Sequence, residues 1–190
     1  KLQSILKENI DIIVCGVSSI GIEWFVQQIS KNYNDNLPIV LLTKGLSIVD
    51  NEITTLSDKI KNLLKKEGYS RINISAIKGP CLAAGLANKM RTGTVIANQN
   101  IKESQLLKEI ISTNYYSTEI SEDITGVELS GAIKNIYSML IGASEGLSNS
   151  KASKEIQSKY FLNTAASLIH RSISEMVEFV SYYGGKPETV

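Results

Sequence analysis

Residues 126–137 read Gly-Val-Glu-Leu-Ser-Gly-Ala-Ile-Lys-Asn-Ile-Tyr, and this stretch decides how the rest of the chain is interpreted. Apolar residues recur in it at the spacing of an α-helix, and small or apolar residues fill most of the other positions. The pattern predicts a largely buried helix that continues to Leu147. Lys134 is the exception, because an unpaired buried ammonium is costly: it must either reach water along its stem or lie in a cavity with partners.

The residues just before Lys134 favour the cavity. Gly126, Ser130 and Gly131 leave the preceding turns of the helix nearly bare, and helical side chains lean toward those turns. A flat ligand could then lie against the backbone beside the ammonium. A lysine on a helix is more often a solvated surface residue, so this stretch alone leaves both interpretations open.

Upstream of this helix, short apolar runs alternate with amphipathic segments. Strands are expected at residues 10–17, 39–43, 72–77, 94–97 and 115–120. Helices are expected at residues 22–32, 52–66, 82–90 and 103–112. Continuous apolar runs are typical of parallel strands that are covered on both faces. The alternation therefore predicts an α/β fold with a mostly parallel sheet and right-handed crossovers.

The chain changes character near residues 121–123, after which the pattern is all helical. The segment from Gly16 to Gly21 spans only GxxxxG, so the first βα unit lacks the GxGxxG turn of a dinucleotide-binding fold. We therefore expect residues 1–122 to be the later half of a Rossmann-type dinucleotide-binding domain. Residues 123–190 are expected to be part of an all-α substrate and catalytic domain, with a polar loop at 148–154.

Composition excludes several classes of function. The 190 residues carry a formal net charge of +1 and are 43% hydrophobic, which gives no indication of a nucleic-acid partner. No apolar run reaches membrane-spanning length. Cys15 and Cys81 lack the spacing of a metal site, so we expect no metal and two reduced thiols in a cytoplasmic protein.

Polar or small residues follow the first three predicted strands, and these residues are Ser18, Ser19, Lys44 and Gly79. In parallel α/β sheets, ligands bind at the carboxyl ends of the strands. These residues should therefore line one edge of a cleft, with Lys134 and Asn135 facing them from the helical part.

These residues also carry a resemblance to a known family. The stretch from Gly126 to Asn135, followed by Gly142 and the triplet at 145–147, resembles the signature of the NAD(P)-dependent glycerol-3-phosphate dehydrogenases. The resemblance implies that Lys134 is the catalytic acid/base and that Asn135 helps to hold the substrate.

Three further family markers occur in the expected order. Val17-Ser18-Ser19 stands where the family has a hydrophobic-Pro-Ser sequence, so Ser18 replaces the proline. Lys44-Gly45-Leu46 matches a lysine-glycine-leucine turn. Gly79-Pro80-Cys81-Leu82-Ala83 matches Gly-Pro-Ser-x-Ala, with cysteine in place of serine. The resemblance implies substrate contacts at Lys44, Gly79 and Cys81, and cofactor contacts at Ser18, Ser19, Lys44 and Ala83.

The family resemblance implies an oxidoreductase that interconverts dihydroxyacetone phosphate and sn-glycerol 3-phosphate with NAD or NADP. Its partner is then a small phosphorylated triose or polyol, within glycerol-3-phosphate and phospholipid metabolism, and a homodimer is compatible with it. The choice between NAD and NADP stays open, because the discriminating residue would follow the second strand of a complete sheet.

Two alternatives remain. A related dehydrogenase for a β-hydroxy acid or 6-phosphogluconate would also use a helix lysine, but usually with its asparagine one turn later, whereas Asn135 is adjacent to Lys134. A non-catalytic relative that binds a nucleotide in the cleft is the second alternative, suggested by Ser18 and Cys81.

Overall fold

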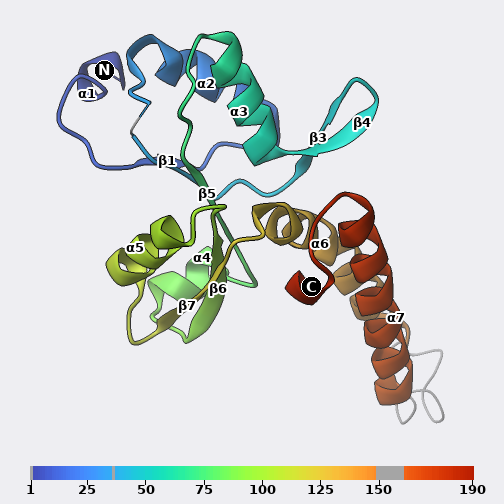
Figure 1. Cartoon of the computed structure of the whole chain (residues 1–190). Coiled ribbons are helices and arrows are strands. Elements are labelled where there is room, and N and C mark those ends of the chain that lie inside the picture. Colours follow the sequence, from blue (N-terminus) through green and yellow to red (C-terminus); the bar gives the residue numbers. More distant parts are fainter. Residues whose placement is uncertain (1, 36, 149–160) are drawn as a thin grey trace.

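The computed structural model describes residues 2–35, 37–148 and 161–190 (Figure 1). The sheet strands are β1 (Ile13–Cys15), β2 (Ile39–Leu41), β5 (Ile74–Lys78), β6 (Thr92–Ala97) and β7 (Tyr116–Ser121), and a separate hairpin holds β3 (Leu46–Val49) and β4 (Glu52–Thr55). The α-helices are α1 (Leu2–Ile5), α2 (Ile22–Ile29), α3 (Leu56–Lys66), α4 (Ala83–Ala87), α5 (Ile101–Ile111), α6 (Ile124–Ser148) and α7 (Phe161–Tyr182). Most of the polar loop expected at 148–154 lies outside the described residues.

The five-stranded sheet has the order β1-β2-β5-β6-β7. Its neighbouring strands are parallel except for β5 and β6, which pair antiparallel with Ala76 opposite Ala97. The mostly parallel sheet predicted from the sequence is thus confirmed. All five strands occur within the expected segments or displaced by a few residues. Because β1, β2 and β5 run in the same direction, their carboxyl ends meet at one edge.

Helices cover the two faces of the sheet unequally. In Figure 1, α2 and α3 lie on one side of the sheet and α5 lies on the other. Alternate residues of β2 divide between these layers, because successive strand residues point to opposite faces. Ile39 and Leu41 join the larger core with α2 and α3, whereas Val40 joins Leu107 of α5 in a smaller one.

The prediction that the strands are covered on both faces was wrong for β1. Val14 in its middle is 57% exposed, and Leu42, just beyond β2, is 44% exposed. Both line an apolar hollow of about 350 Å³ on the α5 side of the sheet, which Leu86 of α4 and Leu107 of α5 also line. The side chain of Trp24 in α2 is also exposed.

The expected helix over residues 52–66 begins only at Leu56, because residues 52–55 form β4. Asp50 and Asn51 both have positive φ angles, of 52° and 65°, which matches the two-residue type I′ turn of a β-hairpin. Ile53 and the threonines after it are β-branched and suit a strand. Thr55 then caps α3, since its side chain accepts a hydrogen bond from the Asp58 N–H.

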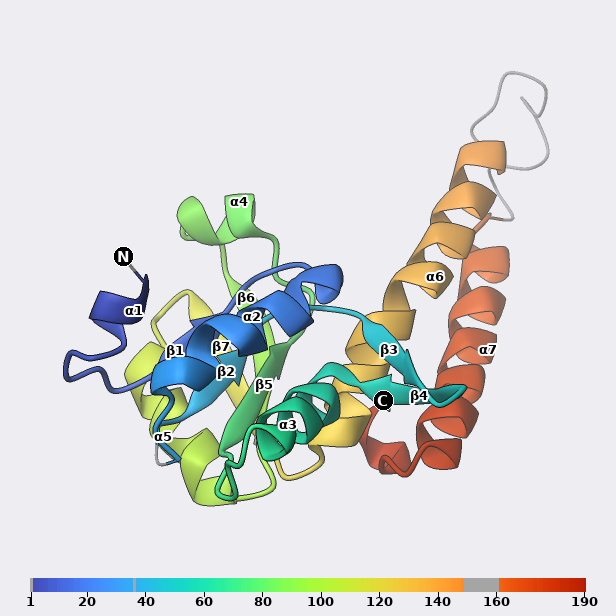
Figure 2. The ribbon, with the colours of Figure 1, turned by 90° about the horizontal axis from the view of Figure 1, so that it is seen from above.

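Helices α6 and α7 run side by side and extend away from the sheet (Figure 2). The first turns of α6 are buried, with Val127 and Leu129 less than 5% exposed. The prediction that the helix is buried along most of its length was wrong, however, because Ile136 and Met139 are more than half exposed. Only the part of α6 that lies over the sheet is largely buried, whereas farther along α7 covers it on one side.

Close packing joins α6 to the end of β5. A Cβ atom added to Gly131 would lie 3.1 Å from both Cβ and Cγ of Lys78. The buried Lys78 stem therefore occupies the space that any larger residue at position 131 would need. Gly142, about three turns farther along α6, has no such neighbour within 4 Å.

We predict that Gly131→Ala destabilises the fold by about 1–3 kcal/mol, because the Cβ and Cγ atoms of Lys78 are held close to the backbone of β5 and cannot move aside. Gly142→Ala is the matched control and should stabilise the protein by about 0.5–1 kcal/mol through helix propensity. Urea unfolding of the complete natural polypeptide measures both changes. Equal stabilisation by the two alanines would contradict the contact.

Tyr33 stabilises the segment that follows α2. Its hydroxyl donates to the Leu37 carbonyl at 3.0 Å, and its ring packs edge-on against Tyr69. Burial, with smaller effects of Asp35 and Tyr69, raises the pKa of Tyr33 from 10.0 to about 12. The native state therefore holds this proton more tightly than the unfolded state does.

We predict that stability is insensitive to Tyr33 ionisation below pH 10 and falls as the pH rises from 10 toward 12. Tyr33→Phe should lose about 1 kcal/mol at neutral pH and weaken this alkaline decline. Unfolding followed as a function of pH measures both effects. Tyr182→Phe, at an exposed ring, is the control, and the same alkaline slope in Tyr33→Phe as in the wild type would refute the assignment.

Candidate active site

The loops after β1, β2 and β5 meet at the carboxyl edge of the sheet. Lys44, in the loop after β2, donates from Nζ to the carbonyl of Gly79 after β5 at 3.3 Å. A Cβ added to Gly45 would lie 3.2 Å from the Cβ of Ser19, so the loop after β1 packs against the same turn. Ser18 precedes Ser19 there and is exposed. The structure thus brings together the residues that the sequence predicted at this edge.

Gly79 has a backbone conformation that only glycine adopts readily. Its φ angle is +152°, and a Cβ atom there would lie 2.8 Å from the Cα of Thr94 and 2.9 Å from the Gly93 carbonyl oxygen. The close approach to β6 fixes the path of the chain just beyond β5. The Gly79 carbonyl is consequently held in place as an acceptor for Lys44.

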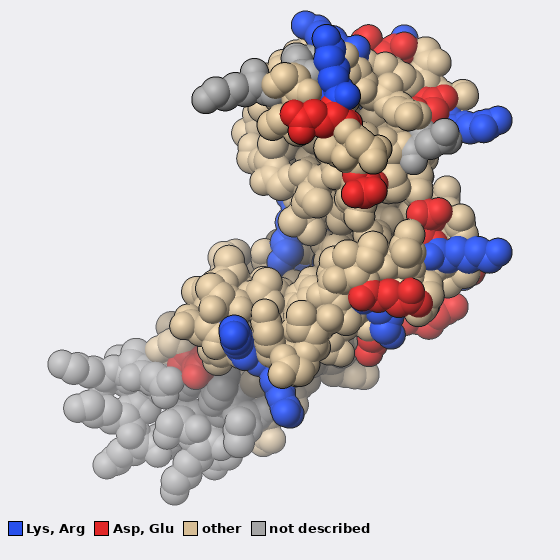
Figure 3. Space-filling view, turned by 90° about the vertical axis from the view of Figure 1, so that its left-hand side faces the viewer, with Lys and Arg blue, Asp and Glu red and all other residues tan. Residues whose placement is uncertain are grey.

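A cavity of about 240 Å³ lies between this edge and the helices α6 and α7. Lys78, Gly79 and Pro80 line it from the sheet side, and Ser130, Gly131 and Lys134 line it from α6. The surface seen in Figure 3 is hollowed between its upper and lower parts, and a basic side chain is visible in that hollow, while basic and acidic side chains are interspersed elsewhere. The bare turns before Lys134 do face a cavity.

Lys134 is half-buried at the seam between the sheet and the helices. Its Nζ donates to the side-chain oxygen of the adjacent Asn135 at 3.3 Å. The Ser130 hydroxyl oxygen, one turn earlier on α6, is buried and has no hydrogen-bond partner within the described parts of the chain. The cavity therefore presents an ammonium and an unused hydroxyl on the same helix.

Two predicted site residues lie farther along the chain from this cavity. Cys81 is half-buried and Ala83 is exposed at the start of α4. Neither is among the residues that line the cavity with Lys134. Their predicted contacts with substrate and cofactor would therefore have to be made outside this cavity, at the rim of the carboxyl edge.

Sequence reasoning missed the charged group at the centre of this region, Lys78. It is the last residue of β5 and only 4% exposed, and its Nζ donates to the Thr43 carbonyl at 2.6 Å and the Leu41 carbonyl at 3.4 Å. From the sequence, a lysine at the end of an apolar strand is expected to lie in the following loop and to be exposed. The small residue Gly131 is the one signal in the sequence that something large packs against α6.

Glu128 of α6 is a second buried charge, 1% exposed. Its carboxylate accepts from the Ser57 N–H in the first turn of α3, at 3.2 and 3.4 Å to its two oxygens. Burial raises the pKa of Glu128, and Lys78 and Ser57 act in the opposite direction. Burial likewise lowers the pKa of Lys78, which Glu128 opposes and Lys44 reinforces. The two buried groups partly compensate each other.

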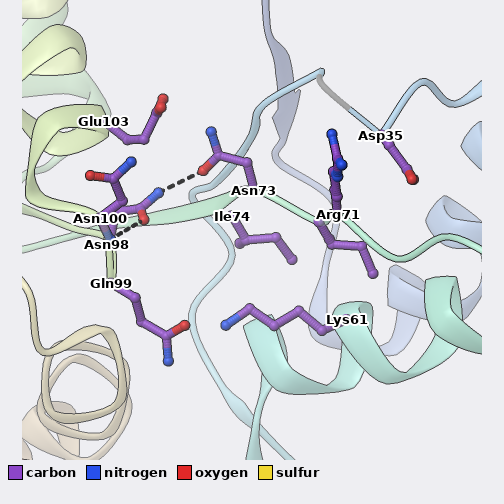
Figure 4. A pocket seen from close by; sticks show the side chains of 10 residues that line it. Asp35, Lys61, Arg71, Asn73, Ile74, Asn98, Gln99, Asn100 and Glu103 are labelled. Carbon is purple, nitrogen blue, oxygen red and sulfur yellow. Dashed lines mark hydrogen bonds between the residues drawn. The ribbon is translucent and has the colours of Figure 1, made fainter.

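A separate, polar pocket of about 520 Å³ lies at the opposite edge of the sheet (Figure 4). The Asn98 side chain donates to Asn73 at 2.8 Å and to Ser75 at 2.7 Å, and accepts from the Asn100 N–H. These bonds use both the amide NH₂ and the oxygen of Asn98 to join β5, β6 and the start of α5. The amide is thus satisfied by the fold itself, and this pocket is distant from the predicted site.

Comparison with known proteins agrees with the geometry. The family model described as NAD-dependent glycerol-3-phosphate dehydrogenase N-terminus matches residues 2–104, and its C-terminus counterpart matches residues 123–190. The chain is 31% identical to an NADP(+)-dependent glycerol-3-phosphate dehydrogenase of Archaeoglobus fulgidus, over 96% of this chain and 51% of that protein. A glycerol-3-phosphate dehydrogenase [NAD(P)+] of Mesoplasma florum is also 31% identical, over 96% and 50%.

Solved structures show the same fold. A glycerol-3-phosphate dehydrogenase from Coxiella burnetii superposes with a TM-score of 0.74 at 27% identity, covering 95% of this chain and 50% of that one. The yeast enzyme gives 0.81 at 20% identity, covering 100% and 52%. The chain spans about half the length of the curated relatives it matches. With family models that match both of its parts in order, the chain belongs to the NAD-dependent glycerol-3-phosphate dehydrogenase family.

Proposed function

We propose that the protein interconverts dihydroxyacetone phosphate and sn-glycerol 3-phosphate with NAD or NADP. The observation that carries this proposal is that Lys134 and Gly79, from two different family markers, line one cavity at the carboxyl edge of the sheet. Its relatives in Archaeoglobus fulgidus and Mesoplasma florum carry the name of this activity. The substrate is a small phosphorylated triose or polyol.

In the proposed reaction, Lys134 is the general acid. Reduction of a ketone places negative charge on its oxygen, and an ammonium within hydrogen-bond reach stabilises that charge and donates the proton. In the reverse direction the neutral amine removes the proton. Asn135, whose side-chain oxygen accepts from the Lys134 ammonium at 3.3 Å, helps to orient both the lysine and the substrate.

The substrate-binding role extends to the opposite wall of the cavity. Gly79 allows close approach to the backbone, and Lys44 supplies a cation that already contacts the Gly79 carbonyl. Cys81 contacts the substrate from the rim. A phosphorylated substrate suits this arrangement, because Lys44 and Lys134 place positive charge at the edge.

The cofactor is proposed to bind at the same edge, held by Ser18, Ser19, Lys44 and Ala83. When bound, NAD(P)H supplies the hydride. The residues present fit such a group. Ser18 and Ser19 lie beyond β1 at the carboxyl edge, where dinucleotides bind in open α/β sheets, and the buried Ser130 hydroxyl has no hydrogen-bond partner among the residues that the structure describes. Lys44 would lie between cofactor and substrate.

The proposal includes two domains, a cytoplasmic location and a homodimer. We place the boundary at residues 122–123, where the α/β pattern gives way to α6. Cys15 and Cys81 are free, which suits a reducing compartment. Within the described residues, no helix has both the length and the hydrophobicity that crossing a bilayer requires. Exposed apolar residues on α6, including Met139, support the homodimer.

We predict that Lys134→Ala lowers kcat for dihydroxyacetone phosphate reduction by about 100-fold or more in the complete natural polypeptide, because the proton donor is lost. Binding of NAD(P)H, followed by its fluorescence, should be retained. Lys65→Ala, at an exposed lysine on α3, is the control and should keep wild-type turnover. A Lys134→Ala enzyme with normal turnover would refute the role of this lysine, and a wild type that cannot oxidise NAD(P)H with this substrate would refute the function.

A further inference from the structure

At the carboxyl edge, Lys44 and Lys78 each donate a hydrogen bond to the backbone carbonyl of a residue next to the other lysine. The Lys78 ammonium donates to the carbonyl of Thr43, the residue just before Lys44. The Lys44 ammonium donates to the carbonyl of Gly79, the residue just after Lys78. The loops after β2 and β5 are therefore linked in both directions. The two bonds differ in setting, because the Lys78 ammonium is buried and bonded at 2.6 Å, whereas the Lys44 ammonium is exposed and bonded at 3.3 Å.

The aliphatic part of Lys78 makes a third connection, to α6. Its Cβ, Cγ and Cδ atoms lie where a side chain at Gly131 would be, at 3.1–3.3 Å from that position. Gly131 and Lys134 are three residues apart and so lie on the same face of α6, one turn from each other. A change in the Lys78 stem would therefore alter the spacing between the sheet edge and the turn that carries Lys134.

The position of the Lys78 charge is poorly explained by stability alone. A buried charged pair contributes little net stability compared with apolar residues of similar volume, since both ions must be taken out of water. No ion pair closer than 4.0 Å joins Lys78 to Glu128 within the described ranges. What the ammonium does make is a short hydrogen bond to the loop that carries Lys44.

We propose that Lys78 is a positioning residue for the reaction. Its ammonium fixes the Thr43 carbonyl and hence the Lys44 loop, and its stem fixes the turn of α6 that carries Lys134. It thereby sets the separation of the two lysines that act on opposite sides of the substrate. This inference rests on the proposed function and assigns Lys78 no contact with substrate or cofactor.

The alternative is that Lys78 only balances the buried charge of Glu128. Three variants of the complete natural polypeptide distinguish the two roles: Lys78→Met, Glu128→Gln and the double variant. Methionine keeps most of the stem and removes the ammonium. Glutamine removes the charge of Glu128 while its side-chain oxygen can still accept from the Ser57 N–H. Lys102→Met, at an exposed lysine of α5, is the matched control.

We expect Lys78→Met to lower kcat/KM for dihydroxyacetone phosphate by about 100-fold, because a small misplacement of reacting groups is enough for such a loss. Because Lys44 is also proposed to contact the cofactor, the Kd for NAD(P)H should rise, but by a smaller factor than that by which kcat/KM falls. Lys78→Met should also lower the melting temperature, since it leaves Glu128 without its compensating charge. The double variant should recover the melting temperature and leave kcat/KM low.

Recovery of kcat/KM together with stability in the double variant would show that charge balance was the whole role, and would overturn the inference. A Lys78→Met enzyme with wild-type kcat/KM would also overturn it. So would a double variant that is no more stable than Lys78→Met, because the loss of activity could then be a consequence of impaired folding. A wild type without turnover on dihydroxyacetone phosphate would overturn the proposed function and this inference together. An active wild type beside an equally active Lys78→Met enzyme would overturn the inference alone.

Discussion

The buried carboxylate of Glu128 holds the helical part of the chain over the edge where the strands end. It reaches from α6 to the Ser57 N–H in the first turn of α3, one of the N–H groups that a helix leaves without an intrahelical partner. A negative charge at a helix N-terminus is favourable, and burial strengthens the interaction. Helix α6 is thereby fastened to the layer that covers the sheet. Together with the packing of Lys78 against Gly131, this bond sets the position of α6 beside the cavity.

Asp123 fixes the angle at which α6 leaves the sheet. Its side chain accepts from the Gly126 N–H at 2.8 Å, and from the Lys186 N–H and the Thr189 hydroxyl at 2.7 Å each. One carboxylate thus caps the start of α6 and also binds the turn after α7. A Cβ on Gly185 would lie 2.7 Å from the Gly126 Cα, so the two segments are in direct contact. The helix pair is therefore held at both of its ends near the sheet.

Much of this architecture could be predicted from local sequence. Runs such as 39–42 are apolar without interruption, and β2 is indeed buried on both faces. The residues after the first three strands were predicted at one edge, and Lys44 and Gly79 are in hydrogen-bond contact there. The hairpin of β3 and β4 could have been found as well. Asp50-Asn51 is a pair that tolerates the positive φ angles of its turn, but the amphipathic pattern that follows was extended too far back.

The errors share a physical cause, which is that periodicity identifies an apolar face and not what covers it. The same spacing continues through α6, yet Leu129 is buried under the sheet edge and Met139 is 68% exposed. Val14 sits in an apolar run and is exposed for the same reason. Lys78 is the converse case, a charge whose burial depends on a carbonyl 35 residues earlier in the chain and on a glycine in another helix. Interactions of this kind are set by tertiary packing, so a single sequence can indicate where the cavity lies but cannot identify every group that shapes it.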